Sequence, residues 1–209
     1  MAKTKNGILD GFEGKLGTVI GYRWKGVECM RAVNAFPHDP RTQAQMKCRT
    51  LFRTLSQLGS DMLQAARLGF RGPADAGHTT EYNCFIRANK QCVASVDDGA
   101  QVDYPALSIA DGPLDEVVFE EPLVDNHLQM NIDFHPKASR RRDDYVLLYA
   151  YTPALRQGLL SPPVYCSQRR ATLMLPDRWR GHDLHLYGFC WDGDRQASPS
   201  SHLGTLTPQ

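Results

Sequence analysis

The sequence has no long apolar run, and no stretch approaches the roughly 18 consecutive apolar residues that cross a bilayer as a helix. A membrane partner is therefore not expected. Residues 1–12, MAKTKNGILDGF, are positively charged. Glycines and charges interrupt them before an apolar core of about 7 to 15 residues can form, so no secretory signal is predicted. We expect a cytoplasmic protein, or one released with an assembly.

Signatures of catalysis and phosphate binding are also missing. No GxSxG elbow provides a nucleophile for an α/β-hydrolase. Gly14-Lys15 fails as a Walker A loop, because Leu9 stands where the first glycine is required and Leu16 where Ser or Thr is required. No two of the N-terminal glycines are two apart, which excludes a GxGxxG fingerprint among them. We predict no catalytic residue, no cofactor and no enzymatic activity.

Metal and disulfide chemistry have little support. The six cysteines form no CxxC pair, which favours reduced and mostly buried thiols: Cys29, Cys48, Cys84, Cys92, Cys166 and Cys190. His182 and His185 are three residues apart in a predicted strand and would lie on opposite faces. Asp133 and His135 would share a face, but a pair with no third ligand is weak evidence for a site. No metal is predicted.

The net charge of +1 conceals an asymmetry between the two halves of the chain. Residues 1–92 hold 14 Lys and Arg against 7 Asp and Glu, a balance of +7. Residues 93–209 hold 10 against 16, a balance of −6. This division predicts either a basic surface for an anionic partner, or two oppositely charged parts that attract neighbouring copies head to tail.

Glycines crowd the first stretch, NGILDGFEGKLGTVIGYRWKG, at residues 6–26. Apolar residues alternate there with small or charged ones and predict a strand: Ile20, Tyr22 and Trp24. A Lys25-Gly26 turn would pair Trp24 with Val27 in a β-hairpin that has an aromatic face. The glycines are interpreted as positions of bends and close backbone approach.

Apolar residues then recur every three or four positions, which predicts helices at about 40–58, 61–69 and 80–90. Asp39 is expected to cap the first helix, with Pro40 at its first position. Its apolar stripe comprises Cys48, Leu51, Phe52, Leu55 and Leu58. Gly59 to Asp61 should end this helix and cap the second, Thr79 or Thr80 should cap the third, and residues 71–80 are predicted as a loop.

From about residue 93 the apolar period becomes 2. Seven runs are predicted as strands: 106–110, 116–120, 127–134, 144–151, 171–176, 183–191 and 202–207. The predicted fold class is α+β, with a glycine-rich hairpin and helical module at residues 1–92 and an antiparallel β-sandwich at residues 93–209. The last strands resemble those of fibronectin type III and other immunoglobulin-like modules, in which Tyr187 would be a corner tyrosine.

Three segments carry a resemblance to a known family: NGILDGFEGKLGTVIGYRWKGVECMRA, DPRTQAQMKCRTLF and EYNCFIRANK. The chain resembles an uncharacterised domain-of-unknown-function family common in Bacteroidota, most strongly over residues 6–53, with Asp39 where the family usually has Asn. That resemblance implies no activity. A looser likeness to prophage-encoded small proteins, in a WKG strand followed by a PxTxxQ helix, implies a virion, tail-like or other assembly role.

These features predict a non-enzymatic structural or assembly protein whose partner is itself or another protein. The alternative is a nucleic-acid-binding module that uses the basic half, with aromatic rings for base stacking. The candidate contact residues for either partner are Lys15, Tyr22, Arg23, Trp24, Lys25, Arg31, Arg41, Arg49 and Arg53.

Overall fold

The computed structural model describes residues 3–4, 12–24, 26–34, 36, 39–96, 99–124, 128–136 and 144–209. The chain divides into two compact units, residues 1–42 and residues 43–209. No helix in the described part of the chain is both long and apolar enough to cross a membrane. The domains predicted from the sequence, residues 1–92 and 93–209, have a different boundary from these two units, and that domain division stays a prediction.

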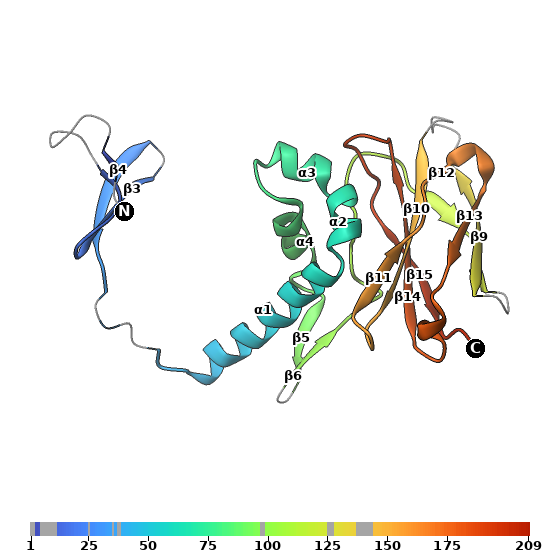
Figure 1. The fold of residues 1–209 in the computed structure, drawn as a ribbon, viewed down its shortest axis with the longest axis horizontal. Helices are drawn as coiled ribbons and strands as arrows, with labels where there is room; N and C mark the ends of the chain where they lie inside the picture. The colour runs from blue at the N-terminus through green and yellow to red at the C-terminus, as the bar shows by residue number, and fades with distance from the viewer. Residues whose placement is uncertain are drawn as a thin grey trace. The chain divides into compact units, whose positions relative to one another are not determined.

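The first unit contains an antiparallel four-stranded sheet in the order β1-β2-β3-β4. Figure 1 labels β3 and β4 of this sheet. Its strands are β1 (Lys3–Thr4), β2 (Phe12–Leu16), β3 (Val19–Trp24) and β4 (Val27–Ala32). The predicted hairpin is confirmed, since Trp24 pairs with Val27 and Gly26 has a φ of +86° at the turn. Lys25 lies outside the described residues. Sequence patterns did not predict β1 and β2.

Gly21 is a place of close backbone approach in this sheet. It pairs with Gly14 of β2, and a Cβ at Gly21 would overlap the carbonyl oxygen of Phe12. The predicted role of glycine in close approach is therefore confirmed here, because only a residue without a Cβ fits beneath Phe12.

The second unit begins with four helices: α1 (Gln43–Asp61), α2 (Leu63–Gly69), α3 (Arg71–Ala76) and α4 (Glu81–Asn89). The predicted start of the first helix at residue 40 is wrong. Arg41 has a φ of +47°, which no α-helix accommodates, and the Asp39 carboxylate lies 3.7 Å from the Arg41 guanidinium. The cap predicted for the third helix is confirmed, since the Thr80 hydroxyl accepts a hydrogen bond from the Asn83 N–H at 3.2 Å.

Two other helix predictions need correction. Gly59 and Asp61 do not separate the first two helices, because both lie within α1. Residues 71–76 form α3 instead of loop. The predicted stripe of α1 is buried only toward its C-terminal end: Leu55 and Leu58 are about 5% exposed, whereas Phe52 is 61% exposed.

The remaining strands are antiparallel. They are β5 (Val93–Val96), β6 (Gly99–Val102), β7 (Val117–Phe119), β8 (Leu123–Val124), β9 (Gln129–Pro136), β10 (Tyr145–Thr152), β11 (Gln157–Leu160), β12 (Val164–Tyr165), β13 (Arg170–Met174), β14 (Leu184–Trp191) and β15 (Ser201–Leu206). One sheet has the order β11-β10-β14-β15, with β12 also on β10; another has the order β13-β9-β7, with β8 also on β9; β5 and β6 form a hairpin. The fold is thus α+β and rich in antiparallel strands.

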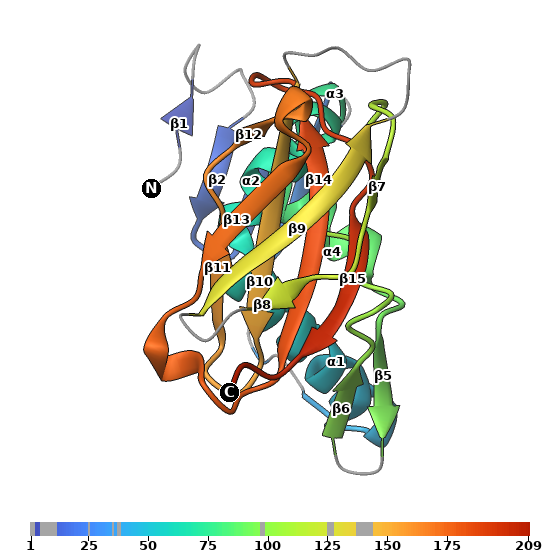
Figure 2. The ribbon, with the colours of Figure 1, turned by 90° about the vertical axis from the view of Figure 1, so that its right-hand side faces the viewer.

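The sheet built on β10 and β14 lies between two hydrophobic clusters. On one face, Leu148 and Leu186 pack against Ile132 and Phe134 of β9. On the other face, Tyr149, Tyr187 and Phe189 pack with residues from the helices. Figure 2 shows β9 and β13 in front of β10 and β14, with α2 and α4 behind. Residues 43–209 therefore form three layers: the helices, the sheet of β10 and β14, and the sheet of β9 and β13.

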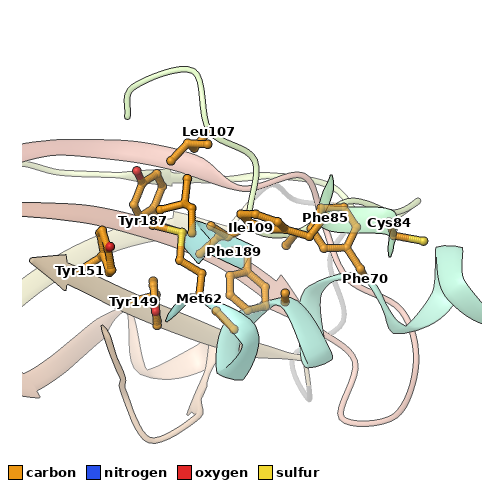
Figure 3. Close-up of a cluster of buried hydrophobic side chains, with 14 of the residues drawn as sticks. Met62, Phe70, Cys84, Phe85, Leu107, Ile109, Tyr149, Tyr151, Tyr187 and Phe189 are labelled. Atoms are coloured by element: carbon orange, nitrogen blue, oxygen red, sulfur yellow. The ribbon is translucent and has the colours of Figure 1, made fainter. Parts of the chain in front are cut away.

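The predicted strand at residues 106–110 is wrong, although its alternation is real. Leu107 and Ile109 are 3% and 0% exposed and lie in the helix-facing cluster (Figure 3). The backbone N–H of Ser108 donates to the Asn89 side chain at 2.7 Å, and that of Ile109 donates to Ser200 Oγ at 2.9 Å. Side chains thus satisfy backbone groups that a strand would pair with another strand.

Candidate functional site

The sheet of the first unit brings four of the predicted contact residues to one face. Lys15 pairs with Ile20 and Arg31 also pairs with Ile20, while Tyr22 and Trp24 follow at two-residue steps on β3. Tyr22 is 42% exposed and Trp24 is 61% exposed. The two cationic side chains therefore flank Ile20, and the aromatic rings follow on the same face toward the turn.

Arg23 lies on the opposite face of this sheet. It pairs with Glu28 of β4, and its Nε donates to the Gly26 carbonyl at 3.4 Å. The face it shares also carries Met30, which is 72% exposed. The predicted set is therefore divided between two faces, because alternate residues of one strand point to opposite sides.

The sheet has almost no interior of its own. Among the described residues between 12 and 42, Gly21 alone is buried. Both faces carry large exposed apolar side chains, namely Leu16 and Met30 on one and Tyr22, Trp24 and Val27 on the other. A small sheet with its apolar side chains in water is a marginal structure until something covers it.

The other predicted arginines lie outside this sheet. Arg41 is in the segment that precedes α1, where it faces Asp39. Arg49 and Arg53 belong to the second unit and lie one helical turn apart on the exposed part of α1. Phe52 and Met46, at 61% and 46% exposed, add apolar area to the same half of α1.

A polar network that the sequence did not predict is centred on Asp61, at the end of α1. Arg156 binds the Asp61 carboxylate with two parallel bonds of 3.1 Å, from Nε to Oδ2 and from Nη2 to Oδ1. Tyr151 Oη donates to Oδ2 at 3.2 Å, and Gln57 Nε2 donates to Oδ1 at 3.1 Å. The Tyr149 hydroxyl donates to the Asp61 carbonyl at 3.3 Å.

Burial raises the pKa of Tyr149 and of Tyr151, and the nearby Asp61 charge raises both further. Both hydroxyls therefore stay protonated and remain donors at neutral pH. The Asp61 side chain is only 11% exposed, so its partners replace most of its water. The network fixes the end of α1 to the turn that joins β10 and β11.

A histidine cluster lies on the helix-facing side of β14 and β15. The His185 ring stacks on Tyr104 with centroids 4.1 Å apart, and His185 Nδ1 lies 3.0 Å from Thr205 Oγ1. His202 lies 5.8 Å from His185 between ring centroids, and its Nε2 is buried without a hydrogen-bond partner among the described residues. Burial lowers the pKa of both histidines, and charge on His202 lowers the pKa of His185 further.

Asp133 and His135, the other carboxylate and histidine pair considered from sequence, have separate partners. Arg170 donates to Asp133 through Nε at 2.5 Å and Nη2 at 2.8 Å, and this bond holds the Asp133 pKa below its usual range. His135 Nε2 lies 2.7 Å from Glu120 Oε1. The Arg170–Asp133 pair is a cross-strand pair of β13 and β9 that supports sheet pairing. The His135–Glu120 pair joins β9 to the residue that follows β7.

A sequence profile of a family of unknown function, DUF6266, matches residues 11–204. The chain belongs to the DUF6266 family. No curated protein and no solved structure matches it significantly. The predicted membership of an uncharacterised family is thereby confirmed, and the match extends from β2 of the first unit to β15 of the second.

The corner-tyrosine prediction is wrong for this DUF6266 chain. Tyr187 is in the middle of β14 and points to the helix-facing cluster, where its hydroxyl donates to the Tyr104 carbonyl at 2.8 Å. A corner tyrosine bonds backbone only a few residues upstream, whereas this bond spans 83 residues. Tyr187 instead joins the sheet to the segment that follows β6.

We predict that acid destabilises the DUF6266 fold through His185 and His202. Their pKa values lie below the unfolded value of 6.5, so the unfolded chain binds more protons and stability falls as the pH drops below about 6.5. Urea unfolding at pH 7.5 and pH 5.5 measures the loss. A His185→Gln/His202→Gln variant should lose less stability between these pH values, whereas His78→Gln, at an exposed loop position, should lose as much as wild type. An equal loss in all three proteins would contradict the prediction.

Proposed function

We propose that this chain is a non-enzymatic assembly protein that associates with further copies of itself through the sheet of residues 12–32. The observation that carries the proposal is the burial of Gly21 alone among the described residues between 12 and 42. Trp24 and Val27 are 61% and 60% exposed side by side at the hairpin end. If a neighbouring copy covered this face, burial would stabilise the complex by about 25 cal/mol for each Å² of apolar surface removed from water.

The edge of the sheet adds a second reason. β4 ends the strand order β1-β2-β3-β4, so one side of residues Val27–Ala32 has no neighbouring strand among the residues that the structure describes. Exposed edges recruit strands from other chains, because their N–H and C=O groups seek partners. The opposite charges of residues 1–92 and 93–209, +7 and −6, favour a head-to-tail arrangement of copies.

The proposal extends to the β-rich part as an immunoglobulin-like module of the fibronectin type III kind. Its support is the strand order: β13-β9-β7 would be strands E-B-A, and β11-β10-β14-β15 would be strands C′-C-F-G. Such modules present surfaces without themselves defining an activity. A cytoplasmic location and a role in a virion-like or tail-like particle stay predictions.

Sedimentation velocity between about 1 and about 100 µM protein tests the proposal. Wild type should form larger species as concentration rises, and Trp24→Ser/Val27→Ser should weaken this association by about tenfold or more. Met174→Ser is the matched control, since Met174 is 58% exposed on β13 of the other unit. A wild type that stays monomeric throughout, or an equal loss in Met174→Ser, would contradict self-association.

A nucleic-acid interface is the second candidate function, and the shared face of Lys15, Tyr22, Trp24 and Arg31 favours it. Cations that track a backbone beside rings that stack on bases are the features of single-strand binding. Arg31→Gln should weaken binding of a labelled single strand about fivefold at low salt and reduce the salt dependence. Arg23→Gln, on the opposite face, should have little effect. No binding at low salt would exclude this function.

A further inference from the structure

A pocket of about 380 Å³ lies in the second unit, beside the Asp61 network. The last turns of α1 supply Arg53, Gln57 and Asp61, and the chain after β6 supplies Tyr104. The end of β10 and the following turn supply Tyr151 and Arg156. This volume falls at the lower end of the roughly 300 to 1,000 Å³ typical of small-molecule sites.

The acidic group of the pocket is already satisfied. Arg156, Tyr151 and Gln57 together donate four hydrogen bonds to Asp61, two to each carboxylate oxygen. An ionised carboxylate offers about four lone-pair positions. Asp61 therefore has no position left for a cation or for a donor on a ligand, and its charge is balanced by Arg156.

The pocket keeps hydrogen-bond donors that are free to bind an anion. Arg53 is exposed and lines the pocket, and its guanidinium has no ion-pair or hydrogen-bond partner within the described part of the chain. Arg156 uses two of its five N–H groups on Asp61 and keeps three. The Tyr104 hydroxyl has no hydrogen-bond partner among the residues described, and burial with the nearby Asp61 charge raises its pKa, which keeps the proton on it.

The walls are apolar and aromatic. The Tyr104 and Tyr151 rings lie 6.1 Å apart between centroids, tilted by 36°. Leu58, Val102 and Pro153 complete the lining. Flat apolar groups pack well against tyrosine faces, whereas a fully hydrated inorganic ion gains nothing from them.

We propose that this pocket binds a small organic anion, a carboxylate or phosphate ester carried on a flat apolar group. The anionic end contacts Arg53 and the remaining N–H groups of Arg156, and the flat group lies against Tyr104 and Tyr151. Two arginines against one carboxylate leave the pocket with an excess of one positive charge. Guanidinium groups recognise planar and phosphate oxyanions through paired hydrogen bonds. This binding is independent of the proposed self-association, because none of the pocket residues belongs to the sheet of residues 12–32.

Isothermal titration of the full chain with phenyl phosphate tests the site, with inorganic phosphate and benzyl alcohol as separate titrants. Phenyl phosphate should bind at least about tenfold more tightly than either, since only it fills both parts of the pocket. Arg53→Gln should weaken phenyl phosphate binding about tenfold, the loss expected for a charge-assisted hydrogen bond. Arg67→Gln is the matched control, an exposed arginine of α2 that does not line the pocket.

Four results would overturn the proposal: no binding of phenyl phosphate, equal binding of inorganic phosphate, equal binding of benzyl alcohol, or an equal loss in Arg67→Gln. If inorganic phosphate bound as tightly as phenyl phosphate, the site would be a simple ion contact at Arg53 to which the aromatic walls contribute nothing. Equal binding of benzyl alcohol would mean that the anion plays no part. Arg53→Gln is chosen over variants of Arg156, because Arg156 also supports the fold through Asp61.

Discussion

Phe189→Ala is expected to lower the free energy of unfolding by about 3 to 5 kcal/mol. Phe189 is 1% exposed on the face of β14 that packs against the helices. Its removal leaves a cavity that β-sheet neighbours on both sides cannot fill, since β10 and β15 hold the β14 backbone in place. Urea unfolding followed by circular dichroism measures the change. Val118→Ala is the control, because Val118 is 59% exposed on β7 and should change stability by no more than about 0.5 kcal/mol.

The same experiment tests whether helices and sheet unfold together. Phe85 of α4 is 0% exposed and belongs to the cluster that contains Phe189. Residues 43–209 should therefore unfold in a single transition, and Phe85→Ala and Phe189→Ala should both shift its midpoint to lower urea concentration. Separate helical and strand transitions, each moved by only one of the two variants, would contradict a shared core.

Gly69→Ala is expected to lower the free energy of unfolding by about 2 to 3 kcal/mol. Alanine normally stabilises a helix relative to glycine by up to about 1 kcal/mol, so the expected sign is opposite to the helix propensity. A Cβ at Gly69 would overlap the carbonyl oxygen of Ile109 and lie 2.5 Å from the Ala110 Cβ. Backbone cannot move aside as a side-chain end can, and the Asp111 N–H donates to the Gly69 carbonyl at 3.0 Å, which holds the two segments together.

Gly59→Ala is the comparison for Gly69→Ala, since both glycines are buried in helices. The three atoms nearest to a Cβ at Gly59 would be side-chain atoms of Tyr82, Phe85 and Ile86, at 3.0 to 3.3 Å. These side chains can shift by a few tenths of an ångström, so the expected change is within about 1 kcal/mol. A Gly69→Ala protein as stable as wild type, measured by thermal unfolding, would show that α2 and residues 109–110 do not pack as closely as described.

Local sequence patterns predicted the structure correctly where residues close together in the chain determine it. Turn chemistry around Gly26 predicted the pairing of Trp24 with Val27, and the hydroxyl of Thr80 predicted a helix start. Alternation predicted strands in six of the seven runs, which overlap β7, β9, β10, β13, β14 and β15. The strand prediction failed at residues 106–110, because a segment packed between helices and sheet buries Leu107 and Ile109 without pairing as a strand.

The candidate sites were harder to predict because distant residues assemble them. Asp61 was expected to cap a helix from its place in a Gly-Ser-Asp sequence, whereas its carboxylate binds Arg156, 95 residues later. No local pattern pairs these residues, or stacks His185 on Tyr104. The shared face of Tyr22 and Trp24 could be predicted, since the period of a strand places alternate residues together.

Amide hydrogen exchange of residues 19–32, compared at about 1 and about 200 µM protein, tests the proposed self-association most directly. Exchange in β3 and β4 should slow at the higher concentration, and Trp24→Ser/Val27→Ser should abolish this dependence. Exchange in β10 and β14, at the centre of the other unit, should be the same at both concentrations. Identical exchange of residues 19–32 at both concentrations in the wild type would contradict assembly through this sheet.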